Sequence, residues 1–117
     1  MSGPKAPHVI HRPDRPLVGL VGLYSWWTNP ATGEMVATTT ILTRESAGIL
    51  APVHDRMPIA LEAADYDRWL DPSNTEGAHL IAEVSDRAAQ TADLWEHYEV
   101  PPLRGDGPHL VERKGTA

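Results

Sequence analysis

The sequence predicts an α+β fold in which a curved, mostly antiparallel β-sheet is joined to a few short helices. Runs of apolar and β-branched residues, typical of strands, fill much of the first half of the chain. Alanine-rich stretches, typical of helices, follow in the second half. Eleven prolines and nine glycines divide the 117 residues into short elements, and 41% apolar residues can form one domain with a small core.

Three strands are expected in the first half. Residues 8–11 form a short strand, which the proline-rich turn at residues 12–16 ends. Residues 17–27 are apolar almost throughout, which indicates a strand buried on both faces. After a turn at residues 28–34, the β-branched residues 35–43 are expected to pair with that strand as an antiparallel hairpin.

Short helices and strands are expected to alternate after the hairpin. Thr43 can cap a short helix that ends at Leu50. Residues 57–61 are expected to form a strand, and residues 62–70 a helix with its apolar side chains on one face.

The last third of the chain is expected to be the most variable part. Residues 72–97 read as a mixed helical and loop segment, with a helix over residues 85–95. Residues 98–101 are expected to return as a strand. Disorder is expected at residues 1–4 and 114–117.

The charge is distributed unevenly along the chain. The net charge is −6, but residues 1–58 carry five Lys/Arg and four Asp/Glu, whereas residues 59–117 carry five Lys/Arg and twelve Asp/Glu. Because affinity for a phosphate backbone comes from cations that displace counterions, any nucleic acid is expected to bind the first half.

The composition also excludes several classes of site. The chain has no cysteine, which excludes disulfides, thiolate metal sites and a thiol nucleophile within it. No apolar run approaches the length of a membrane span, and the first residues lack the apolar core of a signal peptide. A cytoplasmic protein is expected, associated with the nucleoid if it binds DNA, with no cofactor and no membrane partner.

The sequence His54-Asp55-Arg56 is the main candidate for a functional site. It places an imidazole, a carboxylate and a guanidinium in consecutive positions, between Pro52 and Pro58 and two apolar runs. Prolines stiffen such a loop, and a stiff polar loop can hold a side chain for chemistry. The alternative is structural: Asp55 and Arg56 form a local ion pair, and His54 is half-buried.

Seven segments of the chain, read in order, resemble the SOS response-associated peptidase (SRAP) family of abasic-site processing proteins. They are KAPHVIH (5–11), GLYSWW (22–27), TTILT (39–43), APVHDRMP (51–58), YDRWLD (66–71), YEV (98–100) and RGDGPHLVE (104–112). The run His-Asp-Arg-Met-Pro is the most specific of them. The similarity extends from about Lys5 to Glu112 and concerns the second half of the family fold. It implies that residues 1–117 are a single, partial SRAP-like barrel domain.

The resemblance implies chemistry on abasic sites in single-stranded DNA. In the family, an amino-terminal cysteine attacks the aldehyde of the abasic sugar and can close to a thiazolidine. An asparagine positions the sugar, a glutamate transfers protons, and the histidine of the His-Asp-Arg-Met-Pro run assists ring opening and reversal of the crosslink. The family is also classed as a hydrolase with SOS-associated peptidase character.

Carried onto this sequence, the resemblance places His54 at the catalytic histidine and Ser25 at the glutamate. The cysteine and the asparagine have no counterpart, and a hydroxyl cannot replace a carboxylate as a general base or acid at neutral pH. The chain is therefore expected to be truncated, inactive, or one half of a split enzyme that needs a separate N-terminal half or self-association. The alternative is a non-catalytic module that binds single-stranded DNA or protein.

Further candidate contacts are weaker. Arg56, Trp26 and Arg104 are candidates for binding DNA, although core packing of Trp26 and ion pairs of the arginines with Asp55 and Asp106 are the alternatives. Trp26 and Trp27 alternate in direction, so at most one is expected to be free.

Two other kinds of site are disfavoured. A serine hydrolase pairing of Ser25 with His54 lacks the Gly-x-Ser-x-Gly elbow, and Asp55 is expected to point away from His54. No metal site is expected, because His8 and His11 lie on opposite faces of their strand.

Overall fold

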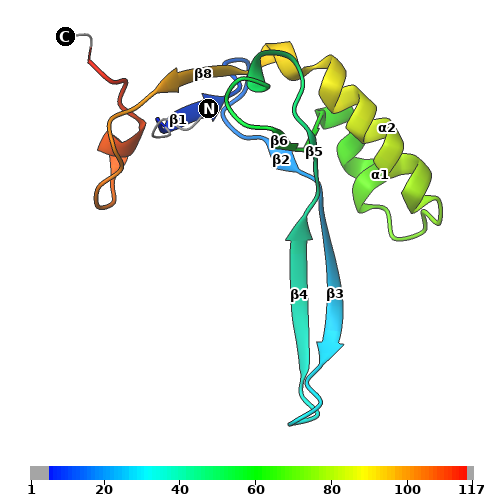
Figure 1. The fold of residues 1–117 in the computed structure, drawn as a ribbon. Coiled ribbons are helices and arrows are strands. Elements are labelled where there is room, and N and C mark those ends of the chain that lie inside the picture. Colours follow the sequence, from blue (N-terminus) through cyan, green and yellow to red (C-terminus); the bar gives the residue numbers. More distant parts are fainter. Residues whose placement is uncertain (1–5, 116–117) are drawn as a thin grey trace.

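Four antiparallel strand pairs carry most of the regular structure in the computed structural model, which describes residues 6–115. The pairs are β1 (His8–His11) with β8 (Glu96–Glu99), β2 (Gly19–Leu20) with β7 (Ala60–Leu61), β3 (Gly22–Thr28) with β4 (Met35–Ile41), and β5 (Thr43–Glu45) with β6 (Arg56–Pro58). The α+β class and the antiparallel pairing are confirmed. The sheet is open and uncurled, because the pairs do not join into one continuous ladder (Figure 1).

The strands meet at a junction of three residues that lie between the pairs. The Val21 amide donates to the Ile59 carbonyl at 2.8 Å, and the Leu42 amide donates to the Val21 carbonyl at 2.9 Å. The Ile59 amide closes the set by donating to the Leu42 carbonyl at 3.1 Å. These bonds connect the β2–β7, β3–β4 and β5–β6 pairs and fix the direction in which each leaves the core.

Two helices pack on one side of this junction (Figure 1). A 3₁₀ turn at Ala63–Asp65 leads into α1 (Tyr66–Leu70), which confirms the helix expected over residues 62–70. Helix α2 (Gly77–Gln90) begins eight residues before the expected start at residue 85. Its inner face is the series Leu80, Val84 and Ala88, spaced by four residues, and this burial extends the helix toward the N-terminal side.

The helix expected from Thr43 to Leu50 is wrong. Thr43–Glu45 instead forms β5, because its backbone pairs with β6, and only Gly48–Leu50 forms a 3₁₀ turn. The range predicted for the last strand is also wrong: β8 covers Glu96–Glu99 rather than residues 98–101. Both errors arise from long-range pairing, which local propensity does not contain.

The core lies between the junction and α2. It consists mainly of Val21, Leu50, Met57, Ile59, Ala60, Leu61, Leu80, Val84, Ala88 and Trp95. A 3₁₀ turn at Ala92–Leu94 places Trp95 at the edge of this cluster. Met57, inside the candidate loop, is only 3% exposed, so the loop is attached directly to the core.

The expected burial of residues 17–27 on both faces is wrong for this chain. Strand β3 pairs with β4 as predicted, but the hairpin projects from the body (Figure 1). Of the β3 residues, only Gly22 is partly buried. The large apolar residues exposed on the hairpin are Leu23, Tyr24, Trp26, Trp27, Met35, Val36 and Ile41. Within residues 6–115, no second layer of structure covers either face.

The C-terminal segment returns to the first strand pair. The Lys114 amide donates to the Glu99 carbonyl at 2.9 Å, and Lys114 Nζ lies 2.7 Å from the Glu99 carboxylate. The disorder expected at residues 114–117 stays a prediction, and residues 1–4 and 116–117 lie outside the described residues. None of the helices in the described chain has both the length and the apolar character needed to cross a bilayer.

Candidate functional site

The loop that carries His54 is fixed by backbone bonds on both sides. The Val53 and His54 amides donate to the Leu50 carbonyl at 3.0 and 3.3 Å. On the far side, the Ser46 amide donates to the Asp55 carbonyl at 2.9 Å and so extends the β5–β6 pair by one residue. The loop is therefore ordered although the His54 side chain is 60% exposed.

The His54 ring is oriented by its own loop. The Arg56 amide donates to His54 Nδ1 at 3.0 Å, which assigns the proton of the neutral ring to Nε2. The Asp55 carboxylate lies 3.0 Å from the same Nδ1, so the expectation that Asp55 points away from His54 is wrong. Asp55 can accept from Nδ1 only when Nδ1 carries a proton, and Nδ1 then no longer accepts from the Arg56 amide. In both states Nε2 remains the atom available to a ligand.

The expected ion pair between Asp55 and Arg56 is absent from the described chain. Arg56 Nη2 instead donates to Thr43 Oγ1 at 2.9 Å, across the β5–β6 pair. No carboxylate in residues 6–115 lies within ion-pair distance of this guanidinium. Arg56 is thus a held cation with its charge available to an anion.

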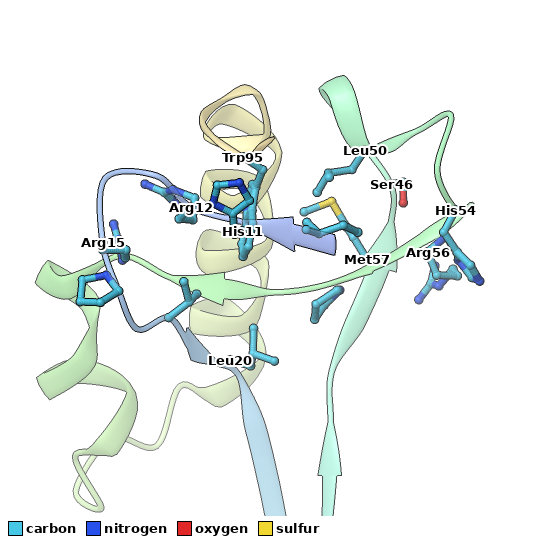
Figure 2. A pocket seen from close by; sticks show the side chains of 14 residues that line it. His11, Arg12, Arg15, Leu20, Ser46, Leu50, His54, Arg56, Met57 and Trp95 are labelled. Atoms are coloured by element: carbon cyan, nitrogen blue, oxygen red, sulfur yellow. The ribbon is translucent and has the colours of Figure 1, made fainter. Parts of the chain in front are cut away.

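His54 and Arg56 line a cavity of about 380 Å³ (Figure 2). Its other polar lining residues are His11, Arg12, Arg15 and Ser46, and its apolar walls include Leu20, Leu50, Met57 and Trp95. In Figure 2, Ser46, His54 and Arg56 gather at one end, and His11, Arg12 and Arg15 lie toward the other. An apolar cavity with a few convergent polar groups is the usual form of a ligand site.

The second end of the cavity is an ion-pair network around the buried Arg12, which the sequence did not suggest. Arg12 is 4% exposed, makes two bonds of 2.9 and 2.8 Å to the Asp14 carboxylate, and donates to Glu62 at 3.0 Å. Arg15 pairs with the second oxygen of Glu62. The guanidinium of Arg12 also lies 5.8 Å above the Trp95 ring. The sequence indicates only a turn at residues 12–16, because Glu62 is distant in sequence.

These contacts shift the pKa values of the network in one direction. The hydrogen bond from Arg12 lowers the pKa of Asp14, and the matching bond to Asp14 raises the pKa of Arg12. Burial acts to raise the pKa of Glu62, but the hydrogen bonds from Arg12 and Arg15 outweigh it and leave that pKa lowered. The network is therefore fully charged at neutral pH.

The structure does not bring Ser25 and His54 together. Ser25 is exposed at the middle of β3, opposite Thr38, whose hydroxyl donates to the Ser25 carbonyl at 3.0 Å. It does not line the cavity, because the hairpin leaves the body at the junction. Ser25 and His54 therefore do not share this cavity, and a nucleophile–base pair of these two residues has no geometric basis.

The remaining candidates for DNA contact lie outside the cavity. Trp26 and Trp27 are 60% and 50% exposed, so the expectation that at most one is free is wrong. Arg104 is in an exposed loop, where its carbonyl accepts a bond of 2.8 Å from His109 Nε2, and within the described chain it makes no ion pair with Asp106. Of the residues predicted to bind DNA, Arg56 shares the cavity with His54.

The histidines of β1 have separate surroundings. His8 Nδ1 lies 3.2 Å from His97 Nδ1, whereas the His11 ring meets Tyr98 edge-on. Across residues 6–115, no cluster of three or more His, Cys, Asp or Glu residues is arranged to hold a metal ion.

Comparison with known proteins identifies relatives over most of the chain. Residues 1–103 match the model of the family described as SOS response associated peptidase (SRAP). The abasic site processing protein YoqW of Bacillus subtilis (strain 168) is 31% identical over 112 residues, covering 92% of this chain and 48% of YoqW. YobE of the same organism, also an abasic site processing protein, is 32% identical over 108 residues, with 92% and 47% covered.

A solved structure shares the fold. An X-ray crystal structure of a protein from Bacteroides thetaiotaomicron matches with a TM-score of 0.75 and 23% identity, over 97% of this chain and 50% of that one. The chain thus spans about half the length of the curated relatives it matches.

Proposed function

Because the chain belongs to the SOS response-associated peptidase (SRAP) family, we propose that it acts in the processing of abasic sites and that its cavity binds single-stranded DNA there. Support comes from the relatives, which are named as abasic site processing proteins. Further support comes from the charge distribution, since the cavity's arginines all lie in residues 1–58, the half without a net negative charge.

The observation that carries the proposal is the arrangement of His54 and Arg56 at one end of the cavity. The Arg56 amide occupies His54 Nδ1 and leaves Nε2 free to bond to a ligand, and the Arg56 guanidinium has no carboxylate partner in the described chain. A neutral ring with its proton on Nε2 can donate that proton to a sugar oxygen and take it back. A cation two residues away can bind the neighbouring phosphate.

His54 is accordingly proposed to assist opening of the abasic sugar, as the family resemblance implies. Arg56 is proposed to position the sugar through its phosphate. Arg104 and Trp26 remain predicted DNA contacts, but they would touch the strand outside the cavity, because neither residue lines it.

The proposal is tested by fluorescence anisotropy with two labelled single strands that differ only in one abasic site. The chain is expected to bind the abasic strand more tightly. Arg56→Ala should weaken binding to both strands about tenfold and reduce the salt dependence by about one counterion, because it removes a charged phosphate contact. His54→Ala should reduce the preference for the abasic strand.

His79→Ala is the matched control for His54. The His79 side chain is 71% exposed on α2, where it pairs with Glu83, and lies outside the cavity. Equal affinity of the native chain for abasic and undamaged strands would refute the proposal. So would an equal effect of the His79 and His54 substitutions.

Covalent attachment to DNA by this chain alone is not expected. The 117 residues contain no cysteine, and Ser25 lies outside the cavity. An abasic oligonucleotide incubated with the chain should run as free DNA on a denaturing gel. A shifted band that survives denaturant would contradict this prediction and identify a nucleophile other than a thiol.

A second candidate function, protein interaction, is favoured by the exposed hairpin. Strands β3 and β4 and their turn carry one charged residue, Glu34, together with seven exposed large apolar side chains. An apolar surface with no cation suits a protein partner better than a phosphate backbone. We propose that either a separate polypeptide that supplies the rest of the family fold or a second copy of the chain covers this hairpin.

A further inference from the structure

Two histidines from opposite ends of the chain bring the same ring nitrogen to one point. His8 is on β1 and His97 is on β8, and their Nδ1 atoms lie 3.2 Å apart. In the antiparallel register His8 is opposite Glu99, so His97 is its diagonal neighbour on the same face of the pair. His11 lies on the other face of β1. The ring that meets His8 is therefore supplied by the far end of the chain.

The distance between the two nitrogens is compatible with two kinds of contact. In the free protein one neutral ring donates from Nδ1 and the other accepts, so the rings share a single proton. The same distance also suits a zinc ion, because two nitrogens bound tetrahedrally at about 2.0–2.1 Å lie about 3.3 Å apart. Neighbouring nitrogens of a square-planar copper site would be closer, at about 2.8 Å, since their bonds meet at a right angle. The observed 3.2 Å favours tetrahedral zinc.

The surroundings of the histidine pair leave room and charge for a cation. Neither histidine is fully buried, and Ile10, on the same face, is 42% exposed. A hydrogen bond from Lys114 lowers the pKa of Glu99, so this residue is a carboxylate at neutral pH. Lys114 Nζ lies 2.7 Å from that carboxylate and offsets its charge. The protein ligands available to a metal are thus the two imidazole nitrogens, with Glu99 as a neighbouring negative charge.

We propose that His8 and His97 bind one zinc ion through their Nδ1 atoms, with water in the other two tetrahedral positions. The ion replaces the shared proton. The ring that donates in the free protein moves its proton from Nδ1 to Nε2 through solvent, so both rings stay neutral and no net proton is released. This inference is independent of the DNA-binding function proposed above.

A zinc ion at this point would join the first strand of the chain to the last. Strands β1 and β8 are held together by their own ladder, and within the described chain neither contributes a residue to the hydrophobic core cluster. Strand β1 continues directly into Arg12, which lines the cavity together with His11. Zinc would therefore stabilise the strand that carries these two residues into the cavity wall.

NMR of the histidine ring nitrogens tests the site in the native chain. Zinc is added at about pH 7.5, where the imidazoles are neutral, and Mg²⁺ serves as the control because it prefers oxygen ligands. The Nδ1 signals of His8 and His97 should shift together and saturate at one ion per chain. The signals of His79 and His109 should not move, and Mg²⁺ should move none of them.

Substitution separates the pair from the other histidines. His8→Gln and His97→Gln should each weaken zinc binding in calorimetry about tenfold or more, because one remaining imidazole cannot chelate the ion. Each should also remove the rise in Tm that zinc gives the native chain. His79→Gln is the matched control, since His79 is 71% exposed on α2 and pairs with Glu83. The Tm of each variant without zinc shows whether it folds.

The native chain decides the question even if a variant fails to fold. Zinc shifts at Nε2 rather than Nδ1, or shifts confined to the other histidines, would overturn the proposal. So would zinc affinity that survives both substitutions. A native chain that shows no saturable zinc binding would mean that the contact between His8 and His97 is a hydrogen bond only.

Discussion

Glu62 is the residue through which pH acts most directly on the cavity wall. Each of its carboxylate oxygens pairs with a different arginine, Arg12 or Arg15, and these bonds lower its pKa despite the opposing effect of burial. A lowered folded-state pKa means that the unfolded chain binds more protons in acid. The stabilisation is then complete above the unfolded value, about 4.3, and is lost as pH falls through the folded pKa.

We expect chemical unfolding at a series of pH values to show this loss as pH falls from about 5 toward 3. Glu62→Gln should be less stable than the native chain at neutral pH and should have a shallower acid slope. Glu83→Gln is the control for Glu62→Gln. The pKa of Glu83 is also lowered, but the main cause is a hydrogen bond from Arg68, which lies outside the cavity. If Glu62→Gln kept the full native slope, the network would not contribute to acid sensitivity.

A substitution at Ser25 tests whether the hairpin is separate from the cavity. The resemblance placed it at a proton-transfer position, whereas the structure places it on the exposed hairpin. Ser25→Glu should therefore move amide NMR signals within β3 and β4 and leave the Arg56 amide, which donates to His54, unmoved. A shift of the Arg56 amide signal would show that the hairpin and the cavity communicate.

The sequence places His54 and Arg56 in one loop with stiff flanks, but it does not predict their contacts. In the structure both residues line the same cavity. Asp55 beside His54, and Arg56 bonded to Thr43, depend on loop torsions and on strand register. The partnership of Arg12 with Glu62 joins residues that only the folded backbone brings together.

The 3₁₀ turn at Gly48–Leu50 is the element that supports the candidate loop. Gly48 has a φ of +57°, and a Cβ there would lie 2.3 Å from Asp93 Oδ1. The Asp93 carboxylate accepts a bond of 3.0 Å from the Ile49 amide, so it is held against the turn. The turn thereby fixes Leu50, whose carbonyl accepts the His54 amide.

Gly48→Ala is expected to destabilise the chain by about 1–3 kcal/mol, because the side chain adds strain at a left-handed position and displaces Asp93. Gly33→Ala is a matched control: Gly33 has a φ of +75°, with nothing within 4 Å of an added Cβ. Urea unfolding of the two variants separates conformational strain from the contact. Equal losses of stability would mean that Asp93 moves aside freely.

Local sequence patterns predicted the helices and strands correctly where residues close in sequence also pair in space. The β3–β4 hairpin and the α1 region were predicted for that reason. The stretch after Thr43 was not, since β5 exists only through its partner β6 across an intervening loop. The burial predicted for β3 was wrong, because an apolar pattern does not reveal whether the chain itself provides a covering surface.

The whole molecule is unusually open for its mass. Its accessible surface is 8655 Å², whereas a compact monomer of 12.8 kDa exposes about 6,300 Å². The radius of gyration is 17.8 Å, compared with about 13 Å for a compact chain of this length. The hairpin contributes to this excess, because Trp26 and Trp27 are 60% and 50% exposed on it.

An apolar hairpin exposed on both faces should be covered in solution. We expect the chain to elute above 12.8 kDa in size exclusion with light scattering and to bind a hydrophobic dye. Trp27→Lys should shift the chain toward the monomer, because it places a charge on an associating surface. Leu103→Lys is the control, since Leu103 is 62% exposed but lies outside the hairpin. A cooperatively unfolding monomer without dye binding would show that the hairpin needs no partner, and the interaction function would then be rejected.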